Sequence, residues 1–94
     1  MTQEIKIQEA IKMIDNHDWY WSMCDTNYER HYNSAKASMR AFVSLVCTIE
    51  NASVREALRS LWTLNYEDAC NGKNRKTTEN FESRKAELLA VITA

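Results

Sequence analysis

A chain of 94 residues has room for one hydrophobic core, so we expect residues 1–94 to form a single helical domain. Its 12 basic and 13 acidic side chains give a net charge of −1, which excludes a strong overall attraction to nucleic acids or anionic membranes. With no proline and a single glycine, the chain lacks the residues that hairpin turns need, and the composition predicts an all-α protein.

The first predicted helix begins after Thr2, whose hydroxyl can cap it, and ends near residue 15 or 16. Its apolar residues recur at helical spacing, at Ile7, Ala10, Ile11 and Ile14. The sequence Asp-Asn-His-Asp at 15–18 then favours a turn, because these side chains compete for backbone hydrogen bonds.

The second predicted helix covers residues 19–49 and is the longest. It shows a heptad pattern, in which apolar and aromatic residues are spaced alternately by four and three: Tyr28, Tyr32, Ala35, Met39, Phe42, Val46 and Ile49. Seven residues before Tyr28 the same pattern reaches Trp21, so we expect the aromatic stretch 19–21 to begin this helix.

A third helix is predicted over residues 53–70. Ser53 and Glu56 fit the S-x-x-E capping box, in which each side chain accepts a free backbone N–H of the first turn. The apolar stripe of this helix consists of Val54, Ala57, Leu58, Leu61, Trp62 and Ala69. Asn71-Gly72 predicts its end, because glycine readily adopts the left-handed conformation that closes a helix.

The last predicted helix follows a polar loop at 73–76 and is capped by Thr77 or Thr78. Its inward residues are Phe81, Lys85 through its stem, Leu88, Leu89 and Ile92. Short joints place consecutive helices antiparallel, so the sequence predicts an up-and-down bundle of three to four helices with a long second helix.

Three consecutive aromatic residues, Trp19, Tyr20 and Trp21, form the candidate interface for another protein. Adjacent residues of a helix point about 100° apart, so the three cannot all face inward, and we expect Tyr20 to reach the surface. The alternative is that these rings close the end of the bundle as part of its core.

Basic residues of the third helix and of the following loop form an alternative site, for nucleic acid. Arg55 and Arg59 share one face of the helix, and the loop 73–76 supplies Lys73, Arg75 and Lys76. Because glutamates such as Glu56 and Glu79 interrupt both groups, we place a nucleic-acid-binding regulator second to a protein-binding function.

No residue pattern predicts catalysis, a metal or a cofactor, and we expect the protein not to be an enzyme. Groups that could serve such chemistry gather in one region: His17, Asp18, Cys24, Asp25, Glu29 and His31. Asp25 and Glu29 share a helical face, but His31 lies on another face, and the E-x-x-H pattern of di-iron bundles is missing. A Cys24 nucleophile would need a base and an orienting group at short range, which sequence proximity does not establish.

The three cysteines lack C-x-x-C spacing, and because their number is odd they cannot all pair within one chain, which favours reduced thiols and a cytoplasmic location. The chain has no continuous hydrophobic segment of the length of a signal peptide or a membrane span. We therefore expect a cytoplasmic protein, monomer or homodimer, without membrane contact.

Three stretches resemble short uncharacterised helical proteins encoded on bacterial phages and mobile elements: N-H-D-W-Y-W-S-M at 16–23, S-M-R-A-F-V at 38–43 and R-E-A-L-R-S-L-W at 55–62. The resemblance implies a bacterial setting and assigns no role to any residue. Together with the aromatic stretch, it leads us to expect a small accessory protein that binds another protein.

Overall fold

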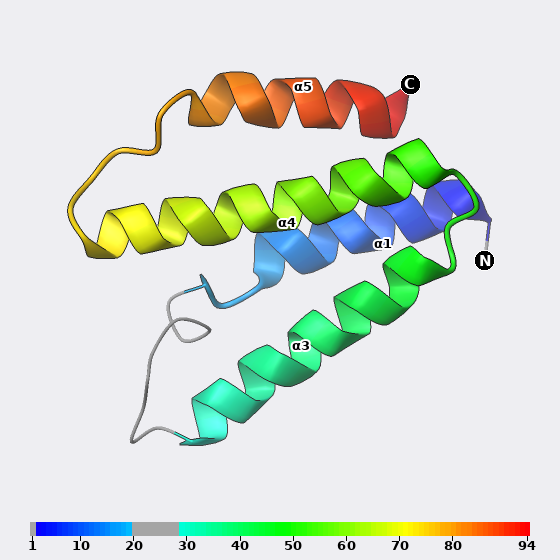
Figure 1. The fold of residues 1–94 in the computed structure, drawn as a ribbon. Coiled ribbons are helices and arrows are strands. Elements are labelled where there is room, and N and C mark those ends of the chain that lie inside the picture. Colours follow the sequence, from blue (N-terminus) through cyan, green and yellow to red (C-terminus); the bar gives the residue numbers. More distant parts are fainter. Residues whose placement is uncertain (1, 20–28) are drawn as a thin grey trace.

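The computed structural model describes residues 2–19 and 29–94, and of residues 29–32 the backbone alone. Four helices and no strand occur in this part of the chain (Figure 1). They are α1 (Gln3–Asn16), α3 (Glu29–Cys47), α4 (Ala52–Lys73) and α5 (Phe81–Thr93). The prediction of an all-α protein is confirmed.

Helix α4 lies at the centre of the arrangement, between α5 on one side and α1 with α3 on the other (Figure 1). Consecutive helices run in opposite directions, and α3 diverges from α4 toward its own N-terminal end. The largest fully buried side chains come from α1, α3, α4 and the turn after α3: Ile14, Phe42, Val46, Ile49, Leu58 and Leu64. Burial of each such side chain contributes about 1.5–3 kcal/mol to folding. Because α4 has neighbouring helices on both of its sides, it holds the core together.

Helix α1 confirms its predicted boundaries. The Thr2 hydroxyl accepts a hydrogen bond of 3.3 Å from the backbone N–H of Ile5, which is the N-cap bond, and the helix ends at Asn16. Ala10 and Ile14 of the predicted stripe are fully buried, while Ile7 and Ile11 pack at the edge of the core.

Helix α3 follows the predicted heptad pattern over its described part. Ala35, Phe42, Val46 and Ile49 are buried, whereas Met39 is 42% exposed. Met39 is one turn nearer than Phe42 to the N-terminal end of α3, the end toward which this helix diverges from α4 (Figure 1). The remainder of the predicted helix, residues 20–28, lies outside the described residues. With 22 residues, α4 exceeds the 19 of α3.

The start of α4 differs from the prediction. The helix begins at Ala52, and its N-cap is Asn51, whose Oδ1 accepts a hydrogen bond of 3.2 Å from the Val54 N–H. The capping box at Ser53 and Glu56 is therefore wrong by two residues. Asparagine caps a helix as well as serine does, and a cap at Asn51 places two more residues in the helix.

The end of α4 also differs. Gly72 lies inside the helix, and the left-handed residue that closes it is Arg75, with φ of 59°. The N–H of Lys76 donates to the Asn71 carbonyl at 2.7 Å, and the N–H of Arg75 donates to the Gly72 carbonyl at 3.0 Å. This pair of bonds is a Schellman motif, a helix end that normally carries glycine where this chain has arginine.

Neither predicted threonine caps α5. The N-cap is Asn80, which is left-handed (φ 56°) and makes no side-chain cap bond. Thr78 is buried because its hydroxyl donates to Asp68 Oδ1 at 2.8 Å and accepts from Asn71 Nδ2 at 3.0 Å. Through these two hydrogen bonds, Thr78 holds the loop between α4 and α5 against α4. Beyond it, Ile92 is buried, and the other predicted inward residues of α5 are half-buried.

Two substitutions at the end of α4 should stabilise the protein. A Cβ on Gly72 would meet no atom within 4 Å, so Gly72→Ala should raise the free energy of unfolding by about 0.5–1 kcal/mol, the usual gain of alanine over glycine inside a helix. Arg75→Gly should add about 1 kcal/mol by removing the cost of a left-handed L-residue. Urea denaturation measures both.

Arg75→Ala is the matched control, because it removes the arginine side chain and keeps the conformational cost. If Gly72→Ala instead lowers the stability, then Gly72 is the left-handed closing residue and the helix end described above is wrong.

Candidate functional site

Four aromatic rings meet where α1 ends, and we call them the aromatic cluster: His17, Trp19, Phe42 and Trp62. The Trp62 ring centroid lies 4.5 Å from His17, 4.6 Å from Trp19 and 4.5 Å from Phe42, with the Phe42 ring stacked at 25°. His17 and Trp19 contact each other edge to face at 4.6 Å. Such offset and edge-to-face contacts are the favourable geometries of aromatic pairs. The cluster therefore joins the end of α1, the middle of α3 and the middle of α4.

His17 is the polar member of the cluster and is only 7% exposed. Its Nδ1 lies 3.1 Å from the Ser38 hydroxyl, with which it shares a hydrogen bond, whereas its buried Nε2 finds no hydrogen-bond partner in the described part of the chain. Burial lowers the pKa of His17 below its ordinary value of 6.5, and the neighbouring Asp18 carboxylate partly opposes this shift. The neutral imidazole is thus the form that the site favours.

The contact between Ser38 and His17 resembles the pair of a serine nucleophile and its base. A cavity of about 180 Å³ beside the pair is lined by Asn16, His17, Asp18, Ser34, Ala35 and Ser38. A catalytic triad, however, requires a third group that orients the second ring nitrogen of the histidine. Within the described residues, Nε2 has no such group. The geometry that is present suits packing and hydrogen bonding.

Of the candidate interface residues, the structure describes Trp19. Trp19 is half-buried, and its Nε1 donates to the Ile14 carbonyl at 3.1 Å. Together with its ring contacts, this bond gives Trp19 a part in closing the end of α1. Tyr20 and Trp21 lie outside the described residues, so the interface at 19–21 stays a prediction.

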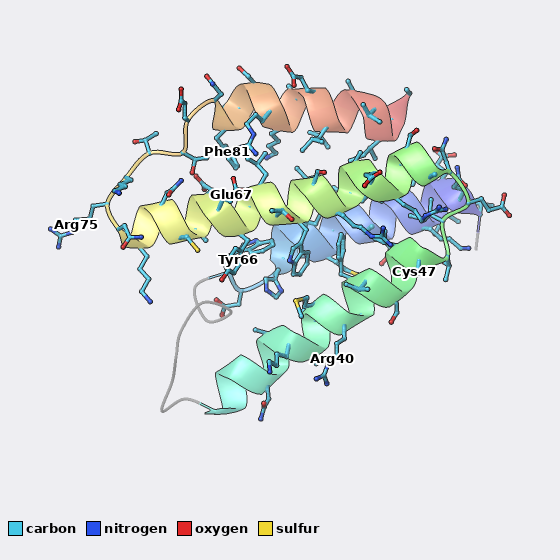
Figure 2. The ribbon with its side chains drawn as sticks, viewed as in Figure 1. Arg40, Cys47, Tyr66, Glu67, Arg75 and Phe81 are labelled. Atoms are coloured by element: carbon cyan, nitrogen blue, oxygen red, sulfur yellow. The ribbon has the colours of Figure 1, made fainter. Side chains whose placement is uncertain are left out.

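The basic residues proposed for nucleic acid lie in two separate places. Arg55 donates from Nη1 to the carbonyls of Ile49 and Glu50, at 2.7 and 2.9 Å, and so binds the turn that follows α3. Arg59 Nη2 contacts Cys47 Sγ at 3.7 Å. The second group, Lys73, Arg75 and Lys76, is exposed at the opposite end of α4, and Figure 2 shows Arg75 pointing away from the helices.

Arg55 and Lys73 are separated by about 27 Å along the helix, at 1.5 Å per residue. One short nucleic-acid contact could not include both groups. The nucleic-acid alternative stays a prediction of the sequence.

The potential metal and thiol groups are described only in part. Cys24 and Asp25 lie outside the described residues, as do the side chains of Glu29 and His31. Among the described residues, no group of three histidine, cysteine, aspartate or glutamate side chains is placed to hold a metal ion. Of the two described cysteines, Cys47 is exposed and Cys70 is half-buried.

The structure reveals a surface that the sequence analysis did not identify. Met39 and Val43 of α3 and Tyr66 of α4 are 42%, 47% and 44% exposed, and we call them the α3–α4 patch. Figure 2 shows Tyr66 on the side of α4 that faces α3, and Arg40 on the outer side of α3. The heptad pattern placed Met39 in the core, and Tyr66 carried no signal. Helix α3 diverges from α4 toward its N-terminal end, on the side of Phe42 where Met39 lies.

No described helix is both long and apolar enough to cross a membrane. Comparison with models of protein families, with curated proteins and with solved structures gives no match. The resemblance to proteins of phages and mobile elements therefore stays a prediction, and the argument for function rests on the residues themselves.

Acidification should destabilise the protein through His17. Because its pKa is lower in the folded than in the unfolded chain, the unfolded chain binds a proton more readily. The contribution of His17 to stability is complete above the ordinary pKa of 6.5 and is lost as the pH falls from 6.5 through the folded pKa. Urea denaturation between about pH 7.5 and 5.5, above the range where most carboxylates titrate, should show this slope.

The slope should flatten in His17→Gln, which cannot be protonated in this range. His31→Gln keeps His17 and measures the contribution of the second of the two histidines in the chain. A slope that persists in His17→Gln and disappears in His31→Gln would contradict the assignment.

Proposed function

We propose that this chain is a small helical protein that acts by binding another protein. The observation that supports this proposal is the α3–α4 patch, where a methionine, a valine and a tyrosine are all more than 40% exposed on adjoining helices. Single exposed apolar residues are ordinary, but a contiguous group on neighbouring elements is a mark of an interaction surface. Tyrosine and methionine are also enriched at the centres of protein interfaces.

The helices that carry the patch are held together by aromatic packing. Phe42, which precedes Val43 in α3, stacks on Trp62 of α4 with ring centroids 4.5 Å apart. Because Phe42 is 2% exposed, its ring is fixed by the surrounding core. A preformed surface loses little conformational entropy on binding, which favours affinity. The patch therefore combines exposed apolar area with a fixed shape.

The setting that we propose follows from the sequence. The resemblance to short proteins of phages and mobile elements favours an accessory protein in the cytoplasm of a bacterium. The aromatic residues Tyr20 and Trp21 directly follow Trp19, which contacts Trp62 at 4.6 Å. The predicted aromatic interface therefore starts from the same cluster that contains Phe42 and Trp62, which neighbour the patch residues along α3 and α4.

Peptide selection tests the proposed function. A random peptide library displayed on phage should yield enriched peptides that bind the wild-type protein. These peptides should lose at least about tenfold in affinity, or 1.4 kcal/mol, for Val43→Asp, because a buried carboxylate without a partner opposes binding. Fluorescence polarisation with each labelled peptide measures the loss.

Val91→Asp is the matched control, because Val91 is a helical valine with 45% exposure on α5, away from the patch. Enriched peptides should bind this variant as they bind the wild type. The absence of enriched peptides, or an equal loss for both variants, would refute a protein-binding function of this surface.

A further inference from the structure

We propose that the α3–α4 patch docks an acidic amphipathic helix of the partner protein. This inference rests on the proposed function and specifies the chemistry of the partner at the same surface. It follows from three properties of the patch: the line along which its apolar side chains lie, the charge of the residues beside them, and the length of the exposed face.

Two of the apolar side chains form a line along α3, and the third lies on the adjoining antiparallel helix α4. Met39 and Val43 are four residues apart on α3 and therefore share one face of the helix. Met39 lies one turn before Phe42, and Tyr66 lies one turn after Trp62. Since α3 and α4 run in opposite directions, both side chains are displaced from the stacked rings toward the same end. Met39 and Tyr66 thus flank the gap where the two helices diverge.

Among the described side chains, the charged residues beside this line are cations. Lys36 and Arg40 are exposed on α3, which carries no acidic residue between positions 33 and 47. On α4, Arg59 is exposed one turn before Trp62 and reaches Cys47 of α3 at 3.7 Å. The acidic neighbour of Tyr66 is Glu67, which turns to α5 and pairs with Arg84 at 3.3 Å. An apolar strip with a basic border therefore lies on a protein whose net charge is −1.

The dimensions fit a helical segment of about two turns. From Met39 to Cys47 the exposed face of α3 extends eight residues, or about 12 Å at 1.5 Å per residue. A helix that lies in a groove binds through apolar residues at positions i, i+4 and i+7, which span a similar length. Acidic residues on the flanks of such a helix would meet Arg40 on one side and Arg59 on the other. Charge complementarity of this kind selects the partner and speeds its association.

Two other occupants fit the patch less well. A second copy, placed by a two-fold axis, would bring the Arg40 and Arg59 side chains of both copies to the same contact, where like charges repel. A nucleic acid could use these cations but would leave Met39 and Val43 against phosphate and sugar, with no apolar surface to bury. The partner that uses both the apolar line and the basic border is an acidic amphipathic helix.

Two synthetic peptides test this inference. Each has about 16 residues, long enough for marginal helicity, and carries leucine at positions i, i+4, i+7 and i+11. One has glutamate at every flanking position and the other has lysine. Isothermal titration calorimetry should give a Kd for the acidic peptide at least about tenfold below that of the basic peptide.

Variants then test the site and the sign of its charge. Val43→Asp should weaken the acidic peptide at least about tenfold, while Val91→Asp should leave its Kd unchanged. Arg40→Glu should weaken the acidic peptide and strengthen the basic one, whereas Lys12→Glu, an exposed cation of α1, should change neither. Circular dichroism of each variant establishes that the fold is retained.

Equal affinity for the two peptides, or no effect of Arg40→Glu, would overturn the acidic-helix assignment. Tighter binding of a single-stranded oligonucleotide that is lost with Arg40→Glu would favour nucleic acid, and a dimer in sedimentation that is lost with Val43→Asp would favour a second copy. If peptides selected from the random library still depend on Val43 in any of these cases, the protein-binding function remains and only the chemistry of the partner is wrong.

Discussion

The contacts of a single side chain, Trp62, connect most of the structure. Its ring meets His17 and Trp19 from the end of α1 and stacks on Phe42 of α3, with every centroid within 4.6 Å. Helix α4 thereby fixes where α1 stops and at what point α3 crosses it. Trp62 is itself half-buried and lies one turn before Tyr66 of the α3–α4 patch. The residue that joins three helices is thus a close neighbour, along α4, of the proposed binding surface.

The sequence was sufficient to predict the class of fold and most of the apolar stripes, because helical periodicity is a property of each segment by itself. Local rules also identified the Thr2 cap correctly. These rules failed where two residues with the same propensity to cap a helix lie close together. Asn51 and Ser53 can each cap a helix, and Asn51 is the N-cap of α4 in the structure. Glycine is favoured in the left-handed position, yet the bonds that close α4 form three residues later, at Arg75. Thr78 makes hydrogen bonds with Asp68 and Asn71 of the preceding helix instead of capping α5, and no local sequence pattern predicts these bonds.

The candidate site was less predictable, for a related reason. A heptad pattern assumes a partner helix along its full length, whereas α3 diverges from α4 and leaves Met39 exposed. Burial of His17 depends on Trp62, which is 45 positions away in the sequence numbering. The basic residues at 55 and 59 and those of the loop 73–76 lie at opposite ends of α4, a separation that follows from the length of this helix. Exposure and grouping are properties of helix crossing, and sequence periodicity contains no information on crossing angles.

The central position of α4 has a consequence for how the domain opens. Helix α4 contacts each of the other three described helices, whereas α5 packs chiefly against α4 alone. Loss of α5 therefore breaks one helix interface, while release of α4 breaks its interfaces with α1, α3 and α5. Backbone amides of α5 should exchange with solvent through this smaller, local opening, and those around Leu58 and Leu61 only when the whole domain unfolds. Hydrogen exchange would then divide the chain into a weakly attached C-terminal helix and a cooperative unit of α1, α3 and α4, which is the unit that carries the aromatic cluster.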